Sequence, residues 1–300
     1  MRVLLTVTTL VAVVSATSVS LEDLEFQEWK LKYGKSYDSE EEESQRKMIW
    51  MTNLKLVLEH NMLADQGLKT YRLGMNHFAD MCNSSPLNRV KGEGSTFRLQ
   101  ANQTWLSNRG EMTGALEGQM FRKTGSLVSL STQQLVDCSW LDGNDGCGGG
   151  SMELAFEYIS RSGGLQTESD YPYKAREGMC MFNPQNVSGK CHDFEELPKG
   201  EEKDLQKAVV AVGPVSVAID SSNKTFLLYQ SGIYNEPYCS SYNVNHGVLV
   251  VGYNTDSSGR EYWVVKNSWG VQWGEQGYIR MSRNKDNQCG IATRASFPLV

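Results

Sequence analysis

A histidine and an asparagine stand at the ends of two short hydrophobic runs late in the chain. His246 opens the run HGVLVVGY, Asn267 follows the run EYWVVK, and the residues between the runs favour a turn. This spacing predicts an antiparallel hairpin that folds back near residues 256–257, with His246 opposite Asn267 at its open end. Because an amide that holds an imidazole fixes its tautomer, the pair suits a general base that exchanges a proton with a nucleophile.

Two tryptophans follow the asparagine in the segment NSWGVQW, at Trp269 and Trp273. Indole rings at these positions would shield a His246–Asn267 hydrogen bond from water, which strengthens such a bond. The alternative interpretation is a structural hairpin that carries a histidine at its open end. The asparagine at the facing position and the NSWG segment favour the catalytic interpretation.

The composition is that of an ordinary globular protein. Of 300 residues, 40% are hydrophobic and 21% are charged, which is enough for one or two cores. The net charge of −6 argues against a nucleic-acid partner. An apolar run over residues 3–14, followed by Ala16, predicts a signal peptide over residues 1–16 and is too short to be a membrane anchor. Four sequons, at Asn83, Asn102, Asn186 and Asn223, fit a glycoprotein of the secretory route.

Helices are expected to precede strands along the chain. Residues 39–67, 151–162 and 201–212 carry apolar side chains at helical spacing, and β-branched runs follow from residue 215. This order indicates an α+β fold rather than a parallel α/β sheet.

The segments VNHGVLVVGY and YWVVKNSWG resemble the C-terminal part of papain-like cysteine proteases, in particular the cathepsin S, L and K group. The resemblance implies a two-lobed papain-like α+β fold behind a helical inhibitory pro-domain, and peptide-bond hydrolysis through a Cys–His–Asn site. His246 matches the general base of the family and Asn267 its orienting partner. The resemblance also implies no cofactor or metal, a monomer located in the lysosome or the extracellular space, and polypeptide substrates or cysteine cathepsins as partners besides its own pro-domain.

Two motifs resemble the pro-region of cathepsin L-like proteins and place a pro-domain over residues 17–81. The first follows one stripe of a helix, and the second lies just beyond it. The matching residues are Glu42, Arg46, Trp50, Asn53, Val57 and Asn61 in the first motif, and Gly74, Asn76, Phe78 and Asp80 in the second.

Further residues match positions that bind substrate in the family. Gly148 and Gly149 resemble a glycine wall that pairs with an extended peptide. Arg294 stands where small or apolar residues are common, so it would favour acidic substrate side chains unless it is an ordinary solvated arginine. The other matching positions are Met152, Ala218, Val244 and Trp269.

The nucleophile of the family has no counterpart. In relatives the cysteine lies six residues before the segment TGALEG, and here that position is Ser107; no cysteine occurs from Asn83 to Asp137. The flanking family residues are replaced too, by Ala101, Thr104 and Asn108 in place of glutamine, cysteine and tryptophan. A serine-based variant through Ser107 is a minor alternative.

The seven cysteines agree with a missing block. The resemblance implies the disulfides Cys138–Cys180 and Cys239–Cys289, whereas Cys147 and Cys191 would pair with cysteines of the missing segment, and Cys82 lies far from the expected nucleophile. We expect residues 82–112 to be a linker without fixed structure and residues 113–300 to be a peptidase domain that lacks its N-terminal part, with a truncated helical lobe and an intact β-rich lobe. The chain is then an inactive endopeptidase homologue or, alternatively, a non-catalytic pseudoprotease or pro-domain-type inhibitor of intact cysteine cathepsins.

Overall fold

The computed structural model describes residues 20–82 and 110–300 of the chain. Several predictions therefore lie outside the described residues, namely the signal peptide, the sequons at Asn83 and Asn102, and the positions Ala101, Thr104, Ser107 and Asn108.

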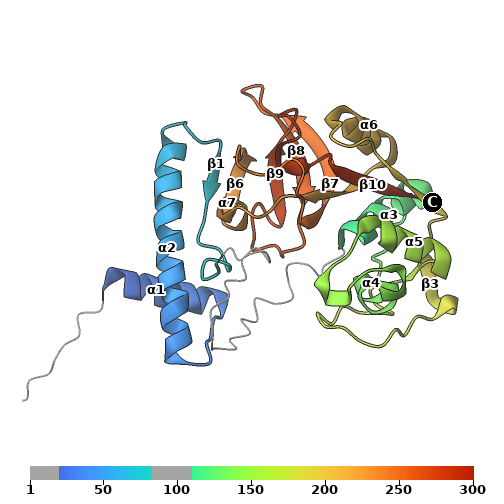
Figure 1. The fold of residues 1–300 in the computed structure, drawn as a ribbon, viewed down its shortest axis with the longest axis horizontal. Coiled ribbons are helices and arrows are strands. Elements are labelled where there is room, and N and C mark those ends of the chain that lie inside the picture. Colours follow the sequence, from blue (N-terminus) through green and yellow to red (C-terminus); the bar gives the residue numbers. More distant parts are fainter. Residues whose placement is uncertain (1–19, 83–109) are drawn as a thin grey trace, which may run out of the picture.

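The N-terminal part consists of two helices and a strand: α1 (Leu21–Tyr33), α2 (Glu40–Asp65) and β1 (Tyr71–Leu73). The Ser20 side chain accepts a hydrogen bond from the Asp23 amide, and the Asp23 carboxylate accepts one from the Ser20 amide, so a capping box starts α1. The helices cross where the rings of Phe26 and Trp29 lie 5.5 and 6.3 Å from the ring of Trp50. Figure 1 shows β1 between α2 and the sheet of the remaining chain.

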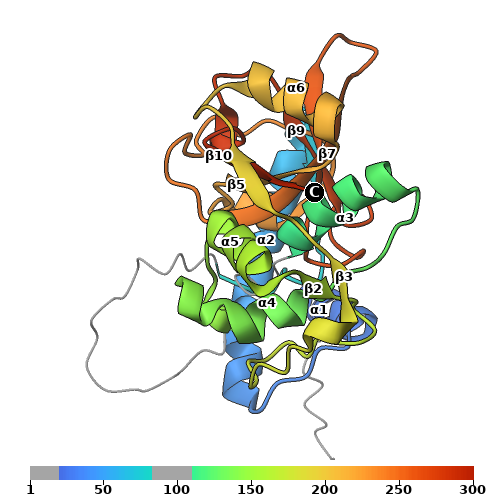
Figure 2. The same ribbon diagram turned by 90° about the vertical axis from the view of Figure 1, so that its right-hand side faces the viewer.

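The helical lobe is formed by α3 (Gly110–Thr124), α4 (Thr132–Cys138) and α5 (Met152–Ser162). It has its own core, in which Leu116, Phe156 and Ile159 are fully buried. The helix α3 begins at Gly110, three residues before the boundary predicted at residue 113, and Met112 is buried in this core. In Figure 2, α4 and α5 lie on the side of α3 away from the loop between β7 (His246–Thr255) and β8 (Glu261–Lys266).

The β-rich lobe is built on one sheet in the order β1-β6-β9-β8-β7-β5-β10-β4. β1 of the N-terminal part pairs antiparallel with β6, so segments about 160 residues apart in sequence share this sheet. The sheet's other strands are β4 (Asp193–Glu196), β5 (Val215–Ile219), β6 (Tyr229–Tyr234), β7 (His246–Thr255), β8 (Glu261–Lys266), β9 (Tyr278–Ser282) and β10 (Arg294–Leu299). The remaining elements are α6 (Glu202–Val212), α7 (Lys224–Leu227), the pair β2 (Leu165–Gln166) and β3 (Val187–Gly189), and four short 3₁₀ turns at Ser139–Asp142, Gly146–Gly148, Pro184–Asn186 and Gln288–Gly290.

The hairpin β7–β8 is present, but its predicted register is wrong. The expected alignment puts Leu249 opposite Val264, whereas in the structure Leu249 faces Lys266 and Val264 faces Gly252. A bulge between Val250 and Gly252 adds one residue to β7. The turn also lies later than expected, where the Asp256 amide donates to the Arg260 carbonyl.

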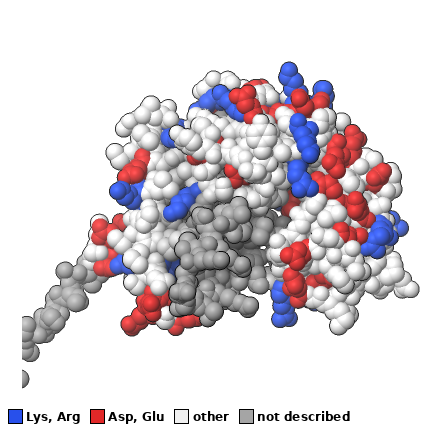
Figure 3. Space-filling view, viewed as in Figure 1, with Lys and Arg blue, Asp and Glu red and all other residues white. Residues whose placement is uncertain are grey.

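The α+β fold class and the two-lobed architecture with a helical N-terminal part are confirmed. Within the described ranges, no helix is both long and apolar enough to cross a membrane. Acidic and basic side chains are intermixed over the face seen in Figure 3.

Candidate active site

His246 and Asn267 meet at the open end of the β7–β8 hairpin. Nε2 of His246 lies 2.8 Å from Oδ1 of Asn267, and both residues are 7% exposed. Oδ1 is an acceptor that also receives the Ser268 amide at 2.8 Å, so the shared proton belongs to Nε2. Neutral His246 therefore carries its proton on Nε2 and can accept a second proton at Nδ1. The side chains come together despite the altered register because Asn267 lies just beyond β8, where its amide can reach diagonally to His246.

Aromatic rings enclose this pair. The Trp269 ring is stacked on the His246 ring, with centroids 4.9 Å apart, and the Phe226 ring meets the His246 ring in a T-shaped arrangement with centroids 6.3 Å apart. Phe78 of the N-terminal part contacts Trp269 with centroids 5.4 Å apart. Trp273 is fully buried and packs on Trp269 at 5.2 Å. The tryptophans therefore take the shielding position expected from the sequence. Phe226 was missed, because it lies on a four-residue helix with no pattern that signals a ring beside the histidine.

A cavity of about 160 Å³ lies beside Asn267, at the start of α3. Glu111 lines it, and a Cβ atom on Gly247 would clash with the Glu111 carboxylate, so a larger residue next to His246 would require that side chain to move. Sequence reasoning missed Glu111 because it assigned this residue to the linker. The cavity is lined by Gly110, Glu111, Gly247, Val248, Leu249, Lys266, Asn267 and Ser268.

The predicted substrate-contacting residues are only partly brought together. Met152 at the start of α5 and Ala218 on β5 belong to the same hydrophobic cluster, and Ala218 pairs with Gly247 next to the catalytic candidate His246. Gly148 and Gly149 lie in a tight loop whose Gly149 carbonyl accepts from the Asp145 amide. Val244 instead lies against Gly290, where an added Cβ would be 2.6 Å from its methyl group.

Arg294 is not an isolated positive charge. Its guanidinium donates to Oε2 of Glu153 at 2.7 Å and to Oγ of Ser151 at 3.2 Å, and the Glu153 side chain is only 11% exposed. This contact joins β10 of the β-rich lobe to α5 of the helical lobe. It opposes the expected preference for acidic substrate side chains, because a carboxylate of the chain itself already compensates the charge.

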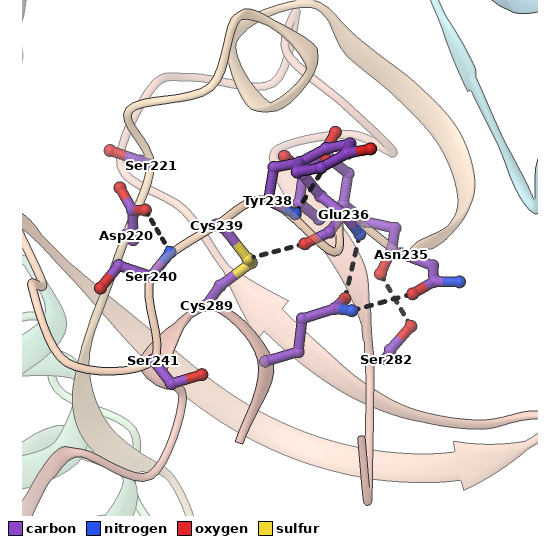
Figure 4. The surroundings of a disulfide bond; sticks show 12 residues. Asp220, Ser221, Asn235, Glu236, Tyr238, Cys239, Ser240, Ser241, Ser282 and Cys289 are labelled. Atoms are coloured by element: carbon purple, nitrogen blue, oxygen red, sulfur yellow. Dashed lines mark hydrogen bonds between the residues drawn. A yellow bond between two sulfur atoms is a disulfide. The ribbon is translucent and has the colours of Figure 1, made fainter. Parts of the chain in front are cut away.

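Four of the cysteines form the two disulfides that the resemblance implied, and the other three lie outside disulfides. Cys138–Cys180 and Cys239–Cys289 form disulfides. Figure 4 shows the second one beside Asp220, whose carboxylate accepts from the Ser240 amide at 2.6 Å. Cys82 is exposed, Cys147 is partly exposed, and Cys191 is buried; none of these three is in a disulfide. Burial raises the pKa of the Cys191 thiol to about 12.

The asparagines of the pro-region motifs hold the second motif in place. Nδ2 of Asn53 donates to the Ala79 carbonyl at 2.8 Å, and Asn61 binds both the carbonyl and the amide of Leu73, at 2.9 and 3.0 Å. Nδ2 of Asn76 crosses to the Leu227 carbonyl of the β-rich lobe at 2.8 Å. These amides therefore connect α2, β1 and α7.

The charged residues of the motifs form a second group, centred on Asp80. Its carboxylate accepts from Lys35 at 3.1 Å and from the Tyr37 hydroxyl at 3.0 Å, and the Arg46 guanidinium donates to its carbonyl. Arg46 also pairs with Glu42 along α2. Burial, reinforced by the Asp80 charge, raises the pKa of Tyr37 well above its ordinary value.

Comparison with known proteins identifies two family models along the chain. The model described as papain family cysteine protease matches residues 111–299, and the model described as cathepsin propeptide inhibitor domain (I29) matches residues 26–84. A cathepsin L-like peptidase of Aedes aegypti is 44% identical over 341 positions, covering 100% of both chains. Cathepsin S of Mus musculus is 44% identical over 305 positions, covering 91% of this chain and 89% of its own. The solved structure of digestive procathepsin L 3 from the Tenebrio molitor larval midgut has a TM-score of 0.82 at 39% identity, and covers 94% of this chain and 100% of that chain.

The alignment with the Aedes aegypti relative is longer than the chain itself. It spans 341 positions, whereas the chain has 300 residues, so about 40 positions pair with no residue here.

Proposed function

Since this chain belongs to the papain family of cysteine proteases and is a homologue of cathepsins L and S, we propose that it carries the base of an endopeptidase site without the nucleophile. In this proposal, His246 is the general base and Asn267 its orienting partner. The 2.8 Å contact between them supports these roles, because it keeps the proton on Nε2 and directs proton exchange to Nδ1.

The reaction of an intact site defines what is missing. A cysteine thiolate attacks the peptide carbonyl carbon, the C–N bond breaks, the imidazolium protonates the leaving amine, and water then hydrolyses the thioester. His246 and Asn267 supply only the proton transfer in this sequence of steps. Loss of a nucleophile lowers kcat by about a millionfold in a comparable protease, so we propose that the chain as written has no measurable endopeptidase activity.

One observation carries the proposal of inactivity: no cysteine occurs from Asn83 to Asp137, the interval in which the family places its nucleophile. Two further findings support a loss of residues rather than separate substitutions. About 40 positions of the alignment with the Aedes aegypti relative have no counterpart, and Cys191 is buried without a disulfide.

The test is hydrolysis of a fluorogenic dipeptidyl substrate by the full chain after acid treatment, with intact procathepsin L 3 of Tenebrio molitor as the positive control. We expect no signal above the buffer rate. Hydrolysis that a thiol-directed epoxide inhibitor blocks would refute the proposal. Hydrolysis that resists the epoxide and disappears in Ser107→Ala would instead support the serine-based alternative.

A second candidate function is inhibition of intact cysteine cathepsins by the pro-domain. The contact of Phe78 with Trp269, beside His246, favours it, because the pro-domain already reaches the catalytic candidates. The assay is titration of an active cathepsin L with this protein, and Phe78→Ala is the variant that should weaken inhibition. A rate unaffected by a large molar excess of the protein would exclude this function.

We also propose the organisation of the whole precursor. Residues 1–16 are a signal peptide, residues 17–81 form the pro-domain, and the peptidase domain begins at Gly110 rather than at residue 113. The apolar N-terminal run supports entry into the secretory pathway, with the lysosome or the extracellular space as destination. Intact-mass analysis of the protein secreted from eukaryotic cells checks both cleavage after Ala16 and glycan occupancy of the four sequons.

A further inference from the structure

The side-chain amide of Asn267 is satisfied at its oxygen but not at its nitrogen. Oδ1 accepts from Nε2 of His246 and from the amide of Ser268, each at 2.8 Å. Nδ2 is buried, and no residue in the described ranges accepts a hydrogen bond from it. Buried donors without an acceptor are costly and rare in folded proteins, so a partner for this NH₂ group is expected.

The orientation of this amide decides which neutral tautomer of His246 is present. With Oδ1 toward the imidazole, Nε2 carries the proton and Nδ1 is the nitrogen that can accept one. A flipped amide would present Nδ2 instead, so Nε2 would become the acceptor and the imidazole proton would lie on Nδ1. The flipped state therefore has the wrong tautomer for a base that acts at Nδ1. A group that binds Nδ2 on the side away from the imidazole stabilises the competent orientation.

Asn267 and Glu111 line the same cavity of about 160 Å³. This volume has room for several water molecules, and polar groups line it. The Glu111 carboxylate lies against Gly247, another lining residue, at the place that a Cβ atom would otherwise occupy. The missing side chain at Gly247 thus leaves space for a carboxylate beside the cavity that Asn267 borders.

The backbone of Glu111 is fixed on both sides of the cavity wall. Oγ of Ser216 on β5 donates to the Glu111 carbonyl at 2.8 Å. The next residue, Met112, is buried in the core of the helical lobe. Glu111 therefore has a defined position at the start of α3, and rotation about its side-chain bonds is what remains adjustable.

Among the described side chains that line the cavity, Glu111 is the strongest acceptor for Nδ2 of Asn267. Lys266 has an ammonium group, which donates and cannot accept. Ser268 has a hydroxyl group, which can accept but carries no charge, and hydrogen bonds to a charged acceptor are the stronger ones. The other lining residues are glycines or have apolar side chains.

We propose that Glu111 is a positioning residue for Asn267. Its carboxylate accepts a hydrogen bond from Nδ2 through water in the cavity, and so holds the amide in the orientation that keeps the His246 proton on Nε2. This inference rests on the proposed function, in which His246 is the general base. Glu111 also lies in the first turn of α3, where an acidic side chain favours the helix dipole. That ordinary role affects the stability of α3 but not the tautomer of His246.

Nitrogen-15 NMR of the full chain, labelled at histidine and recorded where imidazoles are neutral, tests the proposal. The chain has only four histidines, so the His246 signals can be assigned by their loss in His246→Gln. Wild-type His246 should be protonated almost entirely on Nε2. Glu111→Leu removes the acceptor and should raise the share protonated on Nδ1 by about twofold to tenfold, the factor that one hydrogen bond contributes. Glu111→Gln keeps the side-chain size and a neutral acceptor, and should give an intermediate share.

Ser268→Ala is the matched control, because it removes the other side-chain acceptor of the cavity and should leave the tautomer as in wild type. Circular dichroism checks that each variant is folded. A wild-type tautomer in Glu111→Leu, or the shift expected of Glu111→Leu in Ser268→Ala, would overturn the role of Glu111 and leave the proposed function intact. A wild-type His246 protonated mainly on Nδ1 would contradict the proposed function as well, since Asn267 would then not fix the tautomer of the base.

Discussion

Replacing Asn61 with leucine should release β1 from α2. The carbonyl and the amide of Leu73 point away from β6, and the Asn61 side chain binds both of them, at 2.9 and 3.0 Å. The Asn61 side chain thus pairs with backbone groups on the side of β1 where a neighbouring strand would otherwise bind. Leu73 is fully buried, so in Asn61→Leu two backbone groups lose their partners in a place with little access to water.

The cost follows from these two groups. An unsatisfied buried polar group costs about 1–3 kcal/mol, so the loss of both should lower the free energy of unfolding of the pro-domain by roughly 2–6 kcal/mol. For a domain of this size each kcal/mol corresponds to roughly 4–8 °C, so the transition should fall by at least about 8 °C. Asn61→Asp, which keeps the acceptor for the Leu73 amide, should cost less.

The assay combines thermal unfolding with hydrogen exchange at the Leu73 amide. Exchange there should accelerate in Asn61→Leu, and Glu59→Gln, an exposed change on the same helix, should behave as wild type. If Asn61→Leu changes neither the transition nor the exchange at Leu73, the two hydrogen bonds do not hold the strand and the reasoning is wrong.

Three further predictions concern acid, the lobe contact and a thiol. Burial lowers the pKa of His60 and His77, so the stability that their neutral forms give the pro-domain is complete above about pH 6.5 and is lost as the pH falls toward their folded-state pKa values. Urea unfolding at a series of pH values should show a smaller loss of stability in a His60→Gln/His77→Gln variant. Arg294→Ala leaves the carboxylate of Glu153 without its cation and should lower the free energy of unfolding by about 1–3 kcal/mol, whereas Glu153→Gln should cost less, as judged from urea midpoints. Cys191, with its thiol pKa raised to about 12, should resist iodoacetamide at pH 8 in the folded protein and react in urea, as mass spectrometry can show.

The sequence predicted the elements of the active site better than their exact placement. The runs that became β7 and β8 and the pairing of His246 with Asn267 followed from strand patterns and spacing. The register did not, because the bulge at Val250–Gly252 depends on how β7 packs between β5 and β8 rather than on local turn preference. A side-chain contact can survive such a shift when the partner lies just beyond the strand end, as Asn267 does.

Long-range contacts account for what sequence reasoning missed. The pairing of Arg294 with Glu153 joins residues 141 positions apart, and neither flanking segment signals the other. Phe226 reaches the His246 ring from a four-residue helix that has no strong local pattern. By contrast, α2 was predicted to within two residues, since Ser39 caps its start and the apolar spacing ends at its last turn.

The strand β1 belongs to the pro-domain but pairs with β6, so removal of the pro-domain changes the edge of the sheet. While β1 is in place, β6 is an interior strand with neighbours on both sides. Cleavage that removes the pro-domain turns β6 into an edge, with backbone donors and acceptors open to the next extended chain that arrives. The processed protein would then expose a sheet edge, on the side opposite the helical lobe, to which another β-strand could pair. In the precursor, β1 occupies this edge until the pro-domain is removed.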